Sequence, residues 1–167
     1  NVAEAIKGQA VTQTGDQEIA GVKNFVTMPT VNGVPLESSR MAIYEASGVG
    51  EVEAKYQAAF NKDNMKFVLI RVGNRVDAFV RCNLSDPTKL NNHMPKVFNI
   101  PTGYKMSSKI RASVWNIPLS VAPYVFPYPN CNALYEIGNQ GIIFASSRAG
   151  NVYLQGSWYT DDPFPTK

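Results

Sequence analysis

Residues 11–36 read VTQTGDQEIAGVKNFVTMPTVNGVPL, and this stretch carries the most information about the fold. Its apolar residues recur at every third position, which is neither the 3.6-residue period of a helix nor the two-residue period of a strand. The glycines and prolines within it also disfavour a helix. A segment this short cannot bury such a row against itself, but three copies wound around a common axis could. The row consists of Ile19, Val22, Phe25, Met28, Val31 and Val34.

We predict that this row lies on the axis of an interwound homotrimer, with residues 11–40 forming its neck. The alternative is a short hairpin lying on the head, in which Asn32 and Gly33 form the turn. Apolar residues at helical spacing in residues 1–10 indicate the end of an N-terminal helix, which is too short to be stable alone. Residues 41–167 are expected to form a globular head.

The strongest local signal in the head is a pair of strand-like runs. Residues 67–72 form a short, mostly apolar run, and Gly73 and Asn74 follow it. Val76, Ala78, Val80 and Cys82 then alternate with Arg75, Asp77, Phe79 and Arg81. Two runs separated by Gly-Asn predict a tight hairpin. Cys82 falls in phase with the apolar positions of the second run, so its side chain is expected to point into the core.

Further segments predict an all-β head in the form of an antiparallel sandwich or barrel. A second hairpin is expected around residues 138–141, and a final strand over 152–159. Residues 110–114 alternate like a half-buried strand, whereas 51–60 fit either a strand or a helix. Connecting segments are expected at three places, which are the Ser- and Gly-containing residues 37–50, the polar residues 84–96 and the proline-rich residues 116–130.

Composition and charge exclude several classes of protein. Charged residues make up 17% of the chain, below the roughly 25% of an average domain, so partner subunits or uncharged polar ligands are expected to cover much of the surface. The net charge is +3, but Lys and Arg are scattered, so no nucleic acid is expected. No apolar run approaches the roughly 20 residues that span a bilayer, so no membrane partner is expected. Two cysteines make no disulfide framework, which favours assembly in a reducing cytoplasm.

The sequence contains no recognisable arrangement of catalytic residues. The only histidine, His93, stands in a polar loop, and no His or Cys cluster has the spacing of a metal site. Asp161 and Asp162 are adjacent, so in an extended chain they point to opposite sides rather than toward one substrate. We therefore expect no catalytic residue, no metal and no cofactor.

Saccharides are bound by aromatic faces and by planar polar groups that read their hydroxyls. Trp115 is the first choice, because it is out of phase with the apolar residues of 110–114 and precedes the proline-rich segment. The site is expected at the far end of the head, with Trp115 beside residues 116–130 and 146–151. For any single aromatic residue the alternative is the core or a subunit interface. The candidate saccharide-binding residues are Trp115, Glu136, Arg148, Tyr153, Trp158 and Asp161.

The run from Thr14 to Phe25, followed by Val31-Asn32-Gly33, resembles the TGDxTIAGxKTF…VNG segment of phage tail-fibre and baseplate proteins. It is especially similar to the neck of the receptor-binding proteins of lactococcal siphophages. The head resembles theirs in the order of its elements, with IPTGY at residues 100–104 and a Gly-Ser-aromatic strand at 156–159. The resemblance implies an interlaced trimeric β-prism neck and a β-barrel or jelly-roll-like head that binds a host cell-wall saccharide. It also implies a location at the virion's tail tip or baseplate, attached to other tail proteins through the N-terminus.

One departure from that family concerns its saccharide pocket. The relatives carry His-x-Asp on the strand that matches residues 133–137 and a Trp on the next strand, where this chain has Leu134, Glu136 and Ala145 or Ser146. Only the acid is kept, so a different ligand or site is expected. Two other functions remain open, which are a purely structural tail subunit and a tail-associated polysaccharide depolymerase.

Overall fold

The computed structural model describes residues 26–27, 29–31, 34–35, 40–90, 96–113, 115–124 and 130–165. The chain divides into two compact units, Asn1–Leu36 and Glu37–Lys167. Within the described residues, no helix is both long and apolar enough to cross a membrane.

The first unit contains a short antiparallel strand pair. β1 (Thr30–Val31) pairs with β2 (Val34–Pro35), so that Thr30 stands opposite Pro35. The strand pair matches the hairpin part of the alternative, and the place of that hairpin on the head stays a prediction. The trimeric neck stays a prediction, because most of its axial row lies outside the described residues, as does the expected helix over residues 1–10. The axial positions outside the described residues are Ile19, Val22, Phe25 and Met28.

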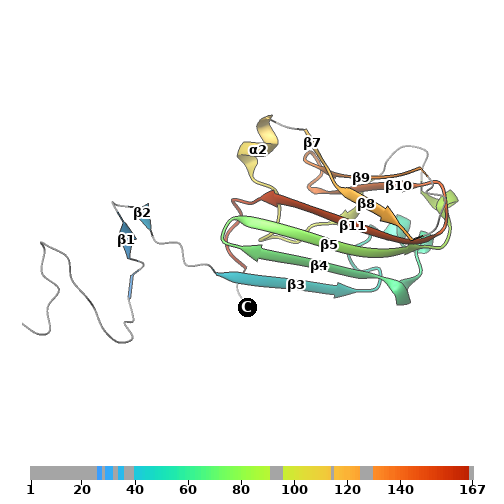
Figure 1. The fold of residues 1–167 in the computed structure, drawn as a ribbon, viewed down its shortest axis with the longest axis horizontal. Coiled ribbons are helices and arrows are strands. Elements are labelled where there is room, and N and C mark those ends of the chain that lie inside the picture. Colours follow the sequence, from blue (N-terminus) through green and yellow to red (C-terminus); the bar gives the residue numbers. More distant parts are fainter. Residues whose placement is uncertain are drawn as a thin grey trace, which may run out of the picture. The chain divides into compact units, whose positions relative to one another are not determined.

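The second unit, the head, consists of two antiparallel sheets (Figure 1). The five-stranded sheet has the order β3-β4-β5-β11-β8, and the four-stranded sheet has the order β6-β10-β9-β7. The first sheet contains β3 (Met41–Ser47), β4 (Lys66–Val72), β5 (Arg75–Leu84), β8 (Ser120–Pro123) and β11 (Gly150–Tyr159). The second contains β6 (Lys96–Asn99), β7 (Asn116–Pro118), β9 (Cys131–Glu136) and β10 (Gly141–Ser146). The prediction of an all-β, antiparallel fold is confirmed.

One hydrophobic core lies between the inward faces of the two sheets, and alternation along the strands fills it. Both predicted hairpins are present as β4–β5 and β9–β10, and β11 is the predicted last strand. Cys82 is fully buried as expected, and burial raises the pKa of its thiol. The largest of the core's fully buried side chains are Tyr135, Phe98, Phe144, Leu69 and Leu84.

The strand predicted over residues 110–114 is wrong, because Ser108–Ser113 forms the short helix α2. The carboxylate of Asp161 accepts hydrogen bonds from the Ser108 backbone N–H at 3.0 Å and from the hydroxyls of Ser107 and Ser108. Such bonds satisfy donors that a helix leaves unpaired at its first turn. The cap comes from a residue more than fifty positions away, so the local alternation could not reveal it.

Two of the predicted connecting segments also contain strands. Residues 37–50 include β3, whose alternating side chains pair with β4 from Met41–Val72 to Ser47–Lys66. Residues 116–130 include β7 and β8, which are edge strands, each with a proline as its last residue. An edge position tolerates proline because its missing N–H is not needed for a second partner.

The remaining elements are short 3₁₀ helices. The ambiguous stretch 51–60 contains η1 (Ala54–Ala59), and η2 (Lys62–Asn64) follows it. The polar segment 84–96 contains η3 (Pro87–Lys89) and ends where β6 begins at Lys96.

The cap of α2 has an expected pH dependence. Hydrogen bonding to Ser108 lowers the pKa of Asp161 below its ordinary value of 3.8. A depressed folded pKa means that the stabilisation is complete above the unfolded value and is lost as pH falls through the folded value. The Ser108 amide NMR signal should therefore shift as the pH is lowered through and below 3.8. Asp161→Asn should abolish that titration, and an unchanged titration in this variant would contradict the assignment.

Candidate functional site

Trp115 is the most exposed large aromatic side chain of the described residues, with 83% of its surface accessible. Its backbone is nevertheless held in place, because its carbonyl accepts a hydrogen bond from the Ile137 N–H at 3.2 Å. Trp115 lies between α2 and β7. The indole is therefore not a core residue in this head, and a fixed backbone presents it to solvent.

Glu136 lies beside Trp115, because β7 pairs with β9 and places Asn116 opposite Glu136. The Glu136 carboxylate accepts a hydrogen bond from the Asn139 side-chain amide at 2.7 Å, across the β9–β10 turn. A depression of about 280 Å³ opens here, and we call it the Trp115–Glu136 site. Its lining residues are Trp115, Asn116, Glu136, Ile137 and Gly138.

The groups at this site suit a polar, ring-shaped ligand. An indole face stacks on the C–H patches of a sugar ring, while a carboxylate and side-chain amides read hydroxyl groups in a plane. Trp115 and Glu136 were both predicted from the sequence, and the structure brings them together. Asn116 and Asn139 were missed, because only the strand register and the turn place them beside Glu136.

Trp158 cannot take part in binding a ligand at the surface, so its prediction as a site residue is wrong. It is 3% exposed, its indole N–H donates to the Tyr104 carbonyl at 2.7 Å, and its ring centroid lies 4.6 Å from that of Tyr135. Along β11 it falls on the inward phase with Val152 and Leu154. This alternation is the sequence signal from which the burial of Trp158 could have been predicted.

Asp161 and its neighbour Asp162 both accept hydrogen bonds that stabilise the fold. Asp161 caps α2, and the Asp162 carboxylate accepts the backbone N–H groups of Gly103 at 2.8 Å and Lys105 at 3.1 Å. As expected for adjacent residues, the two carboxylates have different partners. Asp161 is exposed, and its Oδ2 atom accepts all three hydrogen bonds from Ser107 and Ser108.

Arg148 is exposed on the loop between β10 and β11. That loop lies at the opposite end of β10 from the β9–β10 turn beside Trp115 (Figure 1). Six strand residues at about 3.3 Å each place the two ends roughly 20 Å apart. The prediction that Trp115 and residues 146–151 form one site is therefore wrong, because the strand separates them.

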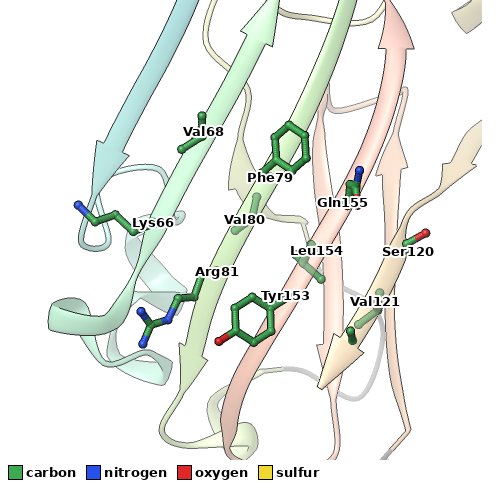
Figure 2. Close-up of a pocket in the computed structure, with 11 residues that line it drawn as sticks. Lys66, Val68, Phe79, Val80, Arg81, Ser120, Val121, Tyr153, Leu154 and Gln155 are labelled. Carbon is green, nitrogen blue, oxygen red and sulfur yellow. The ribbon is translucent and has the colours of Figure 1, made fainter. Parts of the chain in front are cut away.

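Tyr153 belongs to a second surface, on the outward face of the five-stranded sheet (Figure 2). It stands between Arg81 on β5 and Ala122 on β8, and Arg81 in turn stands opposite Lys66 on β4. A cavity of about 350 Å³ opens along this face, and we call it the outer-face cavity. Phe79 and Arg81 are out of phase with the inward-facing Cys82 along β5, but the sequence did not predict that Arg81 stands opposite Tyr153.

A larger cavity, of about 730 Å³, lies at the start of β3. Its aromatic groups are already engaged. The Phe164 ring lies between the guanidinium groups of Arg40, at 4.8 Å, and Arg71, at 4.9 Å, and Tyr104 is buried. We therefore place the candidate site at Trp115 and Glu136.

No group of three or more His, Cys, Asp or Glu side chains that could hold a metal ion occurs among the described residues. His93 lies outside them. No protein-family model matches this chain, and no curated protein matches it.

Proposed function

We propose that this chain is the neck and head of a phage receptor-binding protein that recognises a host cell-surface saccharide without cleaving it. The observation that carries the proposal is the exposed Trp115 indole, held beside Glu136 on a rigid strand pair. An indole with this exposure costs solubility, and a fixed scaffold beneath it is typical of a recognition surface. The likeness of residues 14–33 to phage neck segments supports the same function.

The proposal includes a homotrimer with a β-prism neck, a barrel-like or jelly-roll-like head and a place in the virion's tail tip or baseplate. Exposed apolar side chains at the edge of the head support contacts between subunits. Met41 and Val72 stand opposite each other on β3 and β4, and Ile43 follows on the same face, all of them largely exposed. Light scattering should give a trimeric mass at micromolar concentration, and a monomeric mass would contradict the trimer.

The proposal also holds that the saccharide is not cleaved. The adjacent acids Asp161 and Asp162 hold backbone groups, whereas a glycosidase needs two carboxyl groups facing one bond. Incubation of the trimer with host cell-wall polysaccharide should release no reducing ends. Steady release would favour the depolymerase, and a lack of any binding would favour a structural subunit.

Trp115→Ala tests the site directly. Loss of one stacking face should weaken each site by about 1–2 kcal/mol. Several sites in one particle add avidity, so adsorption to host cells should fall more steeply than the affinity of a single site. The melting temperature should hardly change, because the side chain is exposed. Adsorption and melting are measured on the same preparation.

The control is Tyr124→Ala, which removes another exposed aromatic ring at the end of β8, where the Tyr124 N–H donates to the Asn151 carbonyl. This variant should adsorb normally. If a folded Trp115→Ala protein adsorbed as well as the parent, the Trp115–Glu136 site would be excluded. A glycan array probed with the full chain would then identify the saccharide class that the head does bind.

A further inference from the structure

The outer-face cavity lies on the solvent side of the five-stranded sheet, whereas Glu136 of the Trp115–Glu136 site belongs to the four-stranded sheet. Strand register aligns its side chains in two rows across the sheet. One row runs Lys66, Arg81, Tyr153, Ala122, and the next runs Val68, Phe79, Gln155, Ser120. Figure 2 labels these side chains, except Ala122, on β4, β5, β11 and β8. At about 350 Å³, the cavity is within the size range of small-molecule sites.

The cavity combines aromatic surface with positive charge. Phe79 and Tyr153 are 40% and 43% exposed, so both rings present apolar surface to solvent. Lys66 and Arg81 stand directly opposite each other on β4 and β5. No carboxylate of the described residues lines the cavity, while Gln155 and Ser120 add uncharged polar groups. Two neighbouring cations without an acid attract an anionic group.

Within the described residues, the protein gives Lys66 and Arg81 no carboxylate partner and few hydrogen-bond acceptors. Arg81 donates to the Asn64 side-chain oxygen at 3.3 Å, and among the described residues its Nε is the one buried side-chain polar atom without a hydrogen-bond partner. The Lys66 ammonium donates to the Ser47 hydroxyl at 2.6 Å. Neither cation takes part in an ion pair within the described part of the chain.

Two acids share this face of the sheet but do not neutralise the pair. Asp77 is held by Arg75, whose guanidinium lies 2.9 Å from its carboxylate. Glu45 stands on β3, opposite Val68 and one row away from Lys66, outside the cavity lining. The face therefore keeps an unneutralised positive pair beside two aromatic rings.

We propose that the outer-face cavity is a second saccharide site, specific for a sugar unit that carries a negative charge. The Arg81 guanidinium and the Lys66 ammonium bind the anionic group, since charge-assisted bonds from a guanidinium fork suit a carboxylate or a phosphate. The rings of Tyr153 and Phe79 cover the apolar side of the sugar. The inference rests on the proposed function, and it adds the charge of the ligand and a second position for it.

The test compares three soluble probes with the same ring: glucose, glucuronic acid and glucose 1-phosphate. Ligand-observed NMR on the full-length chain measures the affinity of each. Both charged probes should bind more tightly than glucose, and their affinity should fall as salt is raised. Arg81→Gln and Lys66→Gln should each weaken the charged probes by about tenfold, because each removes a charge-assisted contact. A preference between the two charged probes identifies the anionic group.

Arg75→Gln is the matched control, because it removes a cation of the same face and strand that lies outside the cavity. It should leave both charged probes unaffected. An equal loss in Arg75→Gln would mean that net charge alone attracts the probes, and this would overturn the site. Equal affinity for glucose and the charged probes would overturn it as well. Lys66 is exposed, so Lys66→Gln remains informative if Arg81→Gln fails to fold.

Failure of this inference is distinguishable from failure of the proposed function. If host cells adsorb the parent but the two cation variants adsorb equally well, the outer-face site is wrong and the Trp115–Glu136 site stands. If Trp115→Ala adsorbs normally while the cation variants do not, the outer-face site stands and the Trp115–Glu136 site is wrong. If the charged probes do not bind and Arg81→Gln instead weakens the trimer, the face is a subunit contact and the proposal is overturned.

Discussion

Replacing Arg71 by methionine is expected to lower the free energy of unfolding of the head by about 3 kcal/mol, because it removes the donor for four buried or partly buried carbonyl groups at once. Arg71 is 3% exposed on β4. Its guanidinium donates to the carbonyls of Gly103, Asp162 at 2.9 Å and Pro163 at 3.1 Å, while its Nε donates to Gly73 at 2.8 Å. Methionine has a similar length but no donor.

The expected change goes beyond a loss of stability. Arg71 binds the C-terminal segment to the loop around Gly103, and its guanidinium also lies 4.9 Å from the Phe164 ring. The variant should therefore show earlier proteolysis after Asp162 as well as a lower urea midpoint. Arg75→Met is the control, since Arg75 is exposed and pairs only with Asp77 in the described contacts. Equal midpoints for the two variants would contradict the role given to Arg71.

Gly141→Ala should be almost as damaging, with an expected loss of about 2–3 kcal/mol from overpacking. Gly141 begins β10 and stands opposite Asn99 on β6. A Cβ atom at this position would lie 2.6 Å from the backbone carbonyl oxygen of Phe98 and 2.5 Å from the Lys96 side chain. A lysine side chain can move away, but the Phe98 carbonyl belongs to a strand whose side chains fill the core.

Gly50→Ala is the matched control for this prediction, because a Cβ atom at Gly50 would meet nothing within 4 Å. The two variants add the same methyl group, so the difference between their urea midpoints isolates the clash. We expect Gly50→Ala to be near neutral. A near-neutral Gly141→Ala protein would show that β6 can shift at little cost, and the close approach of the two strands would then not matter for stability.

The two saccharide surfaces proposed for the head would act together. One presents the Trp115 indole with the Glu136 carboxylate, and the other presents the rings of Phe79 and Tyr153 with two cations. A polysaccharide with neutral and anionic units could contact both in turn. Weak single sites are sufficient for such an adhesin, because repeated copies raise the effective concentration of each further contact.

Local sequence patterns were sufficient to predict much of the secondary structure of the head. The Gly-Asn pair after residues 67–72 and the alternation that follows predicted the β4–β5 hairpin and the burial of Cys82, since a two-residue period and a tight turn are properties of neighbouring residues. Trp115 was singled out because it breaks the apolar phase of residues 110–114, and it is exposed even though residues 110–113 belong to a helix.

The features that the sequence did not predict depend on tertiary contacts, because these contacts join residues that are far apart in the chain. α2 exists where a strand was predicted, since Asp161 supplies its cap. Trp158 is buried by Tyr104 and Tyr135 rather than exposed to a ligand. The meeting of Trp115 with Glu136, and of Lys66 and Arg81 with Tyr153, depends on strand register. Sequence alone singled out Trp115, Glu136 and Tyr153 by residue type, and the pairing of distant strands determined which side chains share a surface.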